Sequence, residues 1–443
     1  MKENFFNENV LLYGDASKEI YNYIKDLPII DYHCHLDQHA IKLDKKFTDI
    51  GELWLSGDHY KRRAMRQCGI DEKYITGNAS YYEKFVKYAS IVPMLCGNPL
   101  YYWTHFELKQ VFGINEPLNA ESADRIYKAA NEKLKDLSVQ KLLKLFNVEF
   151  VATTDDPIDD LKDHGTINNT KITPTFRPDK LYSFDSEYIK KIGDVVGHEI
   201  KTLDDLENAL SERLDFFKSK GCRITDHGFK DFPKAYATKE EANELFLNRD
   251  SLNATEKDKL FGYILVFLMK EYKKRNLVVQ LHFSVTRNIN KAMFAKVGVD
   301  AGFDVISDPV NLNDLINFLN QLDDEHRPTI VLYSLNPEVV REVSCISGAF
   351  RNVYVGAAWW FNDTLYGIRK NLEKVSEYAL IGTNLGMLTD SRSFSSYSRF
   401  DFFRRILSSF IGEKVDNGEY ELEEAKKLCY NISYRNIKNL LGE

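Results

Sequence analysis

Short apolar runs alternate with longer amphipathic segments along most of this chain. Apolar runs of about four to eight residues, rich in β-branched side chains, are typical of buried strands. Apolar residues spaced three or four positions apart are typical of helices. Strand-like runs lie at 28–35, 148–154, 171–177, 222–228, 277–282, 329–337, 353–360 and 381–388. Helical patterns lie at 15–26, 203–220, 240–247, 254–274, 312–322, 364–378 and, less regularly, at 400–441.

This alternation predicts an α/β fold, a closed parallel (β/α)8 barrel of the TIM type rather than an open sheet. No GxGxxG run follows a strand, so a dinucleotide-binding sheet is not expected. After the first strand, residues 37–146 carry mainly helical periodicity, which predicts a large, mostly helical insertion. We therefore expect three parts: 1–36 with the first helix and strand, 37–146 as the insertion, and 147–443 as the remaining barrel with the C-terminal helices.

The composition describes an ordinary globular protein. The 443 residues are 44% hydrophobic and 28% charged, and the net charge of −7 argues against nucleic acid or an anionic membrane as the main partner. The six cysteines contain no CxxC pair, no signal peptide is recognisable, and the most apolar run is too short to cross a bilayer. These features predict a cytoplasmic location and leave homo-oligomerisation open.

A metal site is predicted where the first and last strands end. His33 and His35 are two residues apart, so in an extended chain both side chains point to the same face. Closure of a barrel places the end of the last strand, with Asp390, beside them. Two histidines and one carboxylate can hold a divalent cation and leave coordination positions open for substrate or water. The alternatives for Asp390 are a pair with Arg392 or a helix N-cap.

Other polar residues also follow the predicted strands and are expected on the same face. His282 is a candidate catalytic group, either as a fourth ligand or as a hydrogen-bond donor to substrate, although a lone histidine can be structural. Arg177, Arg287 and Arg392 predict a small anionic substrate, because guanidinium groups bind carboxylate or phosphate. The alternative for each arginine is an internal ion pair with Asp156, Asp226 or Asp390.

The predicted insertion contributes one further cluster. Gly57 and Asp58 form a turn signal, and the next residues, His59 and Tyr60, could be brought onto the metal site by a loop. A tyrosine near a cation can have its pKa lowered and can transfer protons. The alternative is aromatic packing under the loop.

Several blocks along the whole chain together resemble the uronate isomerase (glucuronate isomerase) family of the amidohydrolase superfamily. They include Asp31-Tyr-His-Cys-His-Leu36, Gly57-Asp-His-Tyr-Lys61, Thr153-Thr-Asp-Asp-Pro157, Trp359-Trp-Phe-Asn-Asp363 and Gly386-Met-Leu-Thr-Asp-Ser-Arg392. Further blocks lie at 97–105 and 177–180.

The resemblance implies an isomerase that interconverts D-glucuronate with D-fructuronate, and D-galacturonate with D-tagaturonate, through a cis-enediol. It implies that His33, His35 and Asp390 hold a divalent metal, often zinc, and that Tyr60 and Asp390 transfer protons. It also implies that the uronate is oriented by Arg177, His59, Trp359, Arg287 and Arg392. Whether the metal is required, and which uronate is preferred, is left open.

Two other functions are compatible with these residues. A metal-dependent hydrolase acting on a small anionic substrate is the main alternative, but 226–227 and 333–336 lack the carboxylated lysine and the histidine of a two-metal site. A sugar-acid binding protein without activity is the other.

The chain departs from the family pattern at residues 283–290. The family has Ile-Gly-Ala-Leu-Arg-Asn-Asn-Asn there, whereas this chain has Phe283 and Ser284 in place of the first two residues, which predicts a reshaped pocket.

Overall fold

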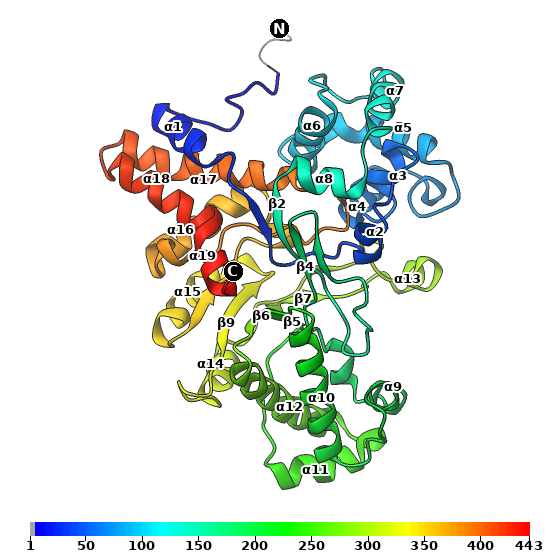
Figure 1. Cartoon of the computed structure of the whole chain (residues 1–443), viewed down its shortest axis with the longest axis vertical. Coiled ribbons are helices and arrows are strands. Elements are labelled where there is room, and N and C mark those ends of the chain that lie inside the picture. The colour runs from blue at the N-terminus through cyan, green and yellow to red at the C-terminus, as the bar shows by residue number, and fades with distance from the viewer. Residues whose placement is uncertain (1–4) are drawn as a thin grey trace.

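The computed structural model describes residues 5–443, with strands at the centre of the molecule and helices around them (Figure 1). Seven strands follow the predicted order: β1 (Ile29–Asp31), β2 (Val148–Ala152), β4 (Thr170–Thr173), β5 (Ile224–Gly228), β6 (Val278–Phe283), β9 (Thr329–Ser334) and β10 (Val353–Val355). Three short strands were not predicted: β3 (Gly165–Ile167), β7 (Val285–Thr286) and β8 (Val305–Ile306).

The central strands pair in parallel as two four-stranded sheets, in the orders β1-β2-β4-β3 and β10-β9-β6-β5. Only the pairing of β3 with β4 in these sheets is antiparallel. Bridges from Phe176 to Asp155 and to Thr225 connect the two sheets. The result is a mixed α/β fold, and the strand pairings do not by themselves delineate a closed barrel.

The predicted eighth strand at 381–388 is wrong. Residues Ile381–Thr383 form a 3-10 turn, and no strand follows them among the described residues. Gly386 has a φ of 75°, in the left-handed region that an extended strand does not use, and its N–H is taken by the side chain of Asn384. The chain still joins β1 farther on, because the Asp390 N–H donates to the His33 carbonyl and the His35 N–H to the Ser391 carbonyl.

The predicted helices that follow the strands match their predictions closely, because each begins after a residue that caps it. Thr202, Thr238 and Asn253 each form a capping box with the residue three positions later. The helices of this part of the chain are α9 (Ser186–Val196), α10 (Leu203–Ser219), α11 (Lys239–Leu247), α12 (Ala254–Lys274), α13 (Lys291–Val297), α14 (Leu312–Asn320), α15 (Val340–Ala349) and α16 (Leu365–Tyr378). Of these, α9, α13 and α15 were not among the predicted helices.

Between β1 and β2 the chain is helical, as the periodicity indicates. These helices lie together on one side of the strands, in the blue to cyan part of Figure 1. They are α2 (Gln38–Lys42), α3 (Ile50–Leu55), α4 (His59–Gln67), α5 (Tyr81–Ile91), α6 (Pro99–Phe112), α7 (Ala123–Leu134) and α8 (Val139–Leu145).

The two ends of the chain pack together. Helix α1 (Asp15–Ile24) lies against α17 (Ser398–Asp416) and α18 (Leu422–Tyr430), and α19 (Asn436–Leu441) follows (Figure 1). Within residues 5–443 no helix combines the length and the apolar character that crossing a bilayer requires.

One buried cluster takes side chains from both sheets. Ile30 and Phe150 of the first sheet pack with Ile224 and Val331 of the second, and Leu388 joins them from the segment that replaces the eighth strand. The cluster packs the two sheets against each other and so supports the strands whose ends carry the cavity residues.

The join between β1 and residue 389 is held by a buried carboxylate. Asp31 is fully buried and accepts hydrogen bonds from the Thr389 N–H (2.9 Å) and the Thr389 hydroxyl (2.6 Å). We expect Asp31→Ala to lower the free energy of unfolding by about 3 kcal/mol, because two buried donors lose their acceptor. Urea unfolding at pH 7.5 measures this. The exposed Asp136→Ala is the control, and equal stabilities of the two variants would contradict the assignment.

Candidate active site

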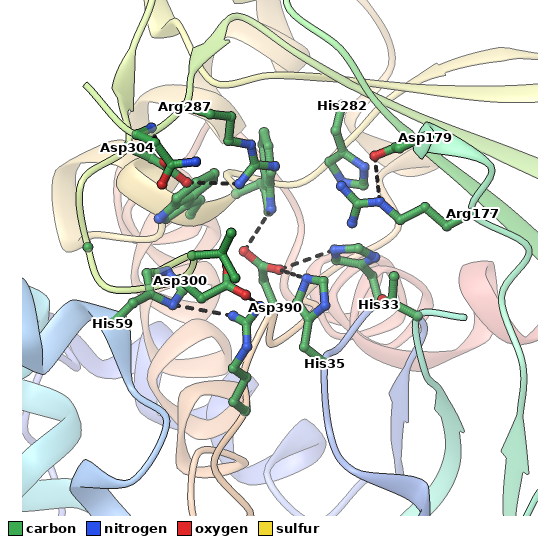
Figure 2. A pocket seen from close by; sticks show the side chains of 17 residues that line it. His33, His35, His59, Arg177, Asp179, His282, Arg287, Asp300, Asp304 and Asp390 are labelled. Atoms are coloured by element: carbon green, nitrogen blue, oxygen red, sulfur yellow. Dashed lines mark hydrogen bonds and ion pairs between the residues drawn. The ribbon is translucent and has the colours of Figure 1, made fainter. Parts of the chain in front are cut away.

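A cavity of about 390 Å3 opens at the carboxyl-terminal ends of the strands (Figure 2). Every residue that the sequence predicted for the site lines this cavity, with the exception of Tyr60. The side chains come from segments as far apart as residues 33 and 392. The folded chain therefore brings together nine of the ten predicted residues.

His33 and His35 converge on one oxygen of Asp390. His33 Nε2 lies 3.2 Å and His35 Nε2 lies 3.1 Å from Asp390 Oδ1. Trp359 Nε1 donates to the other oxygen, Oδ2, at 3.0 Å. Asp390 has a φ of 47°, a left-handed backbone that costs about 1–3 kcal/mol in a residue other than glycine. The hydrogen bond from its N–H to the His33 carbonyl holds this conformation.

The spacing of these ligand atoms fits a metal ion. Zinc binds imidazole nitrogen and carboxylate oxygen at about 2.1 Å, so neighbouring ligands of a tetrahedral site lie about 3.4 Å apart. The two histidine–aspartate distances are close to that value, and all three ligand atoms lie within 4.8 Å of one another. The chemistry of these donors and their convergence suggest a divalent metal.

A second group of potential ligands shares His33 with the first. His33, Asp226 and His282 also offer atoms within 4.8 Å of one another. His282 Nδ1 lies 2.6 Å from Asp226 Oδ1, and its buried Nε2 has no hydrogen-bond partner within residues 5–443. His282 therefore belongs to the Asp226 side of the cavity, and its role as a fourth ligand beside Asp390 stays a prediction.

Arg177 forms an ion pair with Oδ2 of Asp226, whereas His282 contacts Oδ1. Its Nη1 lies 2.9 Å from Asp226 Oδ2, and its Nε lies 2.8 Å from Asp179 Oδ2. The internal ion pair considered as an alternative for this arginine is therefore formed. Gly228 permits it, because a Cβ at that position would lie 2.5 Å from Arg177 Nη2.

The other two arginines of the cavity are also paired with carboxylates. Arg287 Nη1 lies 2.9 Å from Asp304 Oδ2. Arg392 Nη2 lies 3.0 Å from Asp300 Oδ2, and its Nη1 lies 3.4 Å from His59 Nδ1. Neither pairs with Asp156, Asp226 or Asp390, so their partners differ from those considered.

The electrostatics divide the metal-site groups into charged and neutral ones. Burial opposes ionisation of Asp390, but hydrogen bonds with His33 and His35 hold its pKa well below the usual range. Burial lowers the pKa of His35 to about 4, so this imidazole is neutral and can act as a ligand. Burial alone would lower the pKa of His33, yet Asp226 and Asp390 together raise it. Positive charge is thus favoured between these two carboxylates.

Tyr60 does not line the cavity, but it packs against His59, which does. Its hydroxyl donates to Asp363 Oδ2 at 3.0 Å, and its ring lies beside His59 and under the guanidinium of the buried Arg399. Burial and the Asp363 carboxylate raise the pKa of Tyr60 well above its usual value. The phenol is therefore a proton donor at neutral pH in this environment, and the lowered pKa expected beside a bound cation stays a prediction.

The departure at Phe283 and Ser284 does not reshape the cavity wall directly. Phe283 is buried and packs against Phe232, and neither Phe283 nor Ser284 lines the cavity. Ser284 has a φ of 67° at the position where the family pattern has glycine. The backbone thus keeps a left-handed turn that suits glycine, and serine occupies it under strain.

Apart from Asp226, sequence reasoning missed the carboxylates that partner the cavity's arginines and Tyr60. Asp179 and Asp363 stand inside the matched blocks at 177–180 and 359–363, so their position offered a signal. Asp300 and Asp304 lie in a loop segment without any recognisable motif, and only the fold brings them to the cavity.

The comparisons with known proteins agree with this geometry. A family model described as glucuronate isomerase matches residues 1–441. This chain belongs to the glucuronate (uronate) isomerase family. The uronate isomerase of Caldicellulosiruptor saccharolyticus is 42% identical to it over 99% of this chain and 100% of its own length.

Solved structures of family members have the same fold. A crystal structure of uronate isomerase from Thermotoga maritima shares 36% identity, covers 99% of each chain and gives a TM-score of 0.95. A crystal structure of glucuronate isomerase from Caulobacter crescentus shares 25% identity, covers 99% of this chain and 97% of its own, and gives a TM-score of 0.93. The family assignment therefore extends over the whole chain, and the hydrolase alternative is not favoured.

The buried carboxyl group of Asp363 gives a test of the Tyr60 environment. Burial raises the pKa of Asp363 to about 8, although Arg399 opposes the shift. Between about pH 4 and pH 8 the Asp363 carboxyl group is therefore protonated in the folded protein but ionised in the unfolded chain. The free energy of unfolding consequently decreases as the pH rises through this range. We expect Asp363→Asn to gain stability relative to the wild type over that range.

Urea unfolding at pH 5, 6.5 and 8 measures the difference between variant and wild type, with Asp136→Asn as the control. A difference that does not change with pH would show that Asp363 is ionised throughout.

Proposed function

We propose that this protein is an aldose–ketose isomerase of uronic acids, acting on D-glucuronate and D-galacturonate through a cis-enediol. The observation that supports this most is the convergence of His33, His35 and Asp390 inside a cavity lined by arginines. Family membership along the whole chain supports the same activity.

Asp390 acts as the base in this proposal. Moving the carbonyl from C1 to C2 requires removal of the proton on C2, next to the carbonyl. Asp390 is ionised, its Oδ2 keeps a free lone pair beside the Trp359 hydrogen bond, and its backbone strain fixes the direction of the carboxylate. The proton taken from C2 is returned to C1, which converts the enediol into the ketose.

Tyr60 supplies and recovers the second proton. Its phenol stays protonated, so it can donate to the carbonyl oxygen on C1 and take back the proton of the hydroxyl on C2. Its hydroxyl donates to Asp363 in this structure, so proton transfer with the sugar requires exchange of that hydrogen bond. Asp363 is the partner to which it returns.

Residues His33, His35 and Asp390 would hold the divalent metal, with zinc as the proposed identity from the imidazole–carboxylate donor set. When bound, the ion supplies positive charge that polarises a substrate oxygen. His282, with its partnerless Nε2, is placed to donate to or accept from the sugar.

Arg177, Arg287, Arg392, His59 and Trp359 are proposed to orient the sugar acid, because all line the cavity. Holding the carboxylate sets the register of C1 and C2 against Asp390. The likeness to solved isomerase structures and the buried cluster shared by both sheets support a closed (β/α)8 barrel with the cavity at its carboxyl end. A cytoplasmic location, consistent with six free cysteines, and a small-molecule uronate partner are part of the proposal, and homo-oligomerisation stays open.

The function is tested by incubating purified protein with D-glucuronate and with D-galacturonate in D2O. Proton NMR follows ketose formation and deuterium at C1, and the relative rates give the preference. Conversion of at least one uronate is expected. No conversion of either sugar, with a lactone or amide hydrolysed instead, would replace the isomerase by the hydrolase alternative.

Asp390→Asn and Tyr60→Phe should each lower kcat by about 10²–10⁴, because each removes a positioned acid or base. KM should change much less for Tyr60→Phe, whose ring and packing are retained. Steady-state kinetics on D-glucuronate measure both, with His326→Gln as the control, because this histidine is exposed, precedes β9 and does not line the cavity. Normal turnover by Asp390→Asn would point to a binding protein or another base.

A further inference from the structure

Each arginine of the cavity is already neutralised by a carboxylate of the protein itself. Arg177 is paired with Asp179 and Asp226, Arg287 with Asp304, and Arg392 with Asp300. An anionic substrate that binds a guanidinium here must therefore compete with an internal carboxylate. The pair that yields most easily determines where the substrate's carboxylate binds.

The Arg392–Asp300 pair is the one most open to exchange. The side chain of Asp300 is 46% exposed, compared with 28% for Asp179 and 11% for Asp304. The Asn288 N–H also donates a hydrogen bond to Asp304 Oδ1 at 2.7 Å, which holds this carboxylate in place. An exposed carboxylate can leave its partner and be hydrated at little cost, whereas a buried one cannot.

The backbone around Asp300 is fixed although its side chain is not. Arginines of α4 donate to the carbonyls of Asp300 (3.2 Å, from Arg62) and Ala301 (3.0 Å, from Arg66). Gly302 packs so closely on α4 that a Cβ there would lie 3.0 Å from the His59 carbonyl. Asp300 can therefore release Arg392 by a side-chain rotation, without movement of the segment. Figure 2 shows its carboxylate directed into the cavity beside His59.

We propose that Asp300 is an internal competitor that occupies Arg392 until the carboxylate of the sugar acid replaces it. This inference rests on the proposed function and adds a determinant of substrate class to it. A uronate restores the ion pair that Asp300 gives up, whereas a neutral sugar leaves Arg392 without a counter-charge if it displaces Asp300. Asp300 thus selects for anionic sugars at the expense of affinity.

The test uses D-gluconate, a sugar acid without a carbonyl to isomerise, as the probe of binding. Isothermal titration gives its affinity for the wild type, for Asp300→Asn and for the control Asp308→Asn, an exposed aspartate of the same segment. We expect Asp300→Asn to bind gluconate roughly three- to tenfold more tightly, as expected for release of one partly exposed ion pair. KM for D-glucuronate should fall by a similar factor with kcat within about twofold. Asp308→Asn should match the wild type.

A double-mutant cycle with Arg392→Met separates competition at Arg392 from a general charge effect. In the Arg392→Met background, Asp300→Asn should change gluconate affinity by less than about twofold. Circular dichroism verifies folding, and Asp300→Ser serves as a second variant of the same kind.

Weaker or unchanged gluconate binding by both Asp300 variants would overturn the proposal and assign Asp300 to positioning Arg392. The proposal would also be overturned if Asp300→Asn raised gluconate affinity as much in the Arg392→Met background, or if Asp308→Asn raised it as much. Either result would show a long-range electrostatic effect instead of competition at Arg392. These outcomes do not depend on turnover. If the wild type isomerises no uronate but Asp300→Asn still binds gluconate more tightly, the proposed function fails while the competition at Arg392 stands.

Discussion

The site depends on one set of hydrogen bonds that joins residues 31–35 to residues 389–391. Asp31 binds Thr389, the His33 carbonyl accepts from the Asp390 N–H, and the Ser391 carbonyl accepts from the His35 N–H. These bonds place the carboxylate of Asp390 against the two imidazoles that follow β1, although Asp390 itself lies in no regular strand. Without the join, Asp390 would lie on a different loop from His33 and His35, and the three side chains could not share a cation.

The same join explains which parts of the structure the sequence predicted. Helices such as α10, α11 and α12 were predicted within about two residues, because amphipathic periodicity and capping residues are local signals. The last strand was mispredicted because its apolar run looks extended, whereas Gly386 turns the backbone and the contacts that hold the segment are to β1. The histidine pair was predicted because residues two apart in an extended chain share a face.

The charged residues show where sequence reasoning stops. It identified the cavity's arginines but not their actual partners, apart from Asp226, since ion pairs form between segments that only the fold brings together. Asp300 and Asp304 stand in a loop without a motif. The raised pKa of Tyr60 likewise follows from burial beside Asp363, about three hundred residues away in sequence, and no local pattern encodes it.

Charge is nearly balanced within the cavity before any substrate enters. Asp390 and Asp226 face His33 and Arg177, and the remaining arginines face their own carboxylates. On the proposal made for Asp300, a site of this kind would bind an anion by exchange of ion pairs rather than by supplying excess positive charge, which agrees with the overall negative charge of the chain. Specificity then comes from which internal pair can be exchanged and from the geometry fixed around Asp390.

The most direct test of the account is the metal content of purified protein, stripped with a chelator, reloaded with zinc and measured by plasma mass spectrometry. The account predicts about one tightly held ion per chain in the wild type and in the control His326→Gln. Asp390→Ala and His35→Ala should each lower the zinc affinity by more than about 100-fold. Loss of a residue that only supports a ligand already lowers metal affinity roughly 10- to 100-fold. Wild-type protein that holds no ion, or variants that hold it as tightly as the wild type, would contradict the claim that these three residues share one cation.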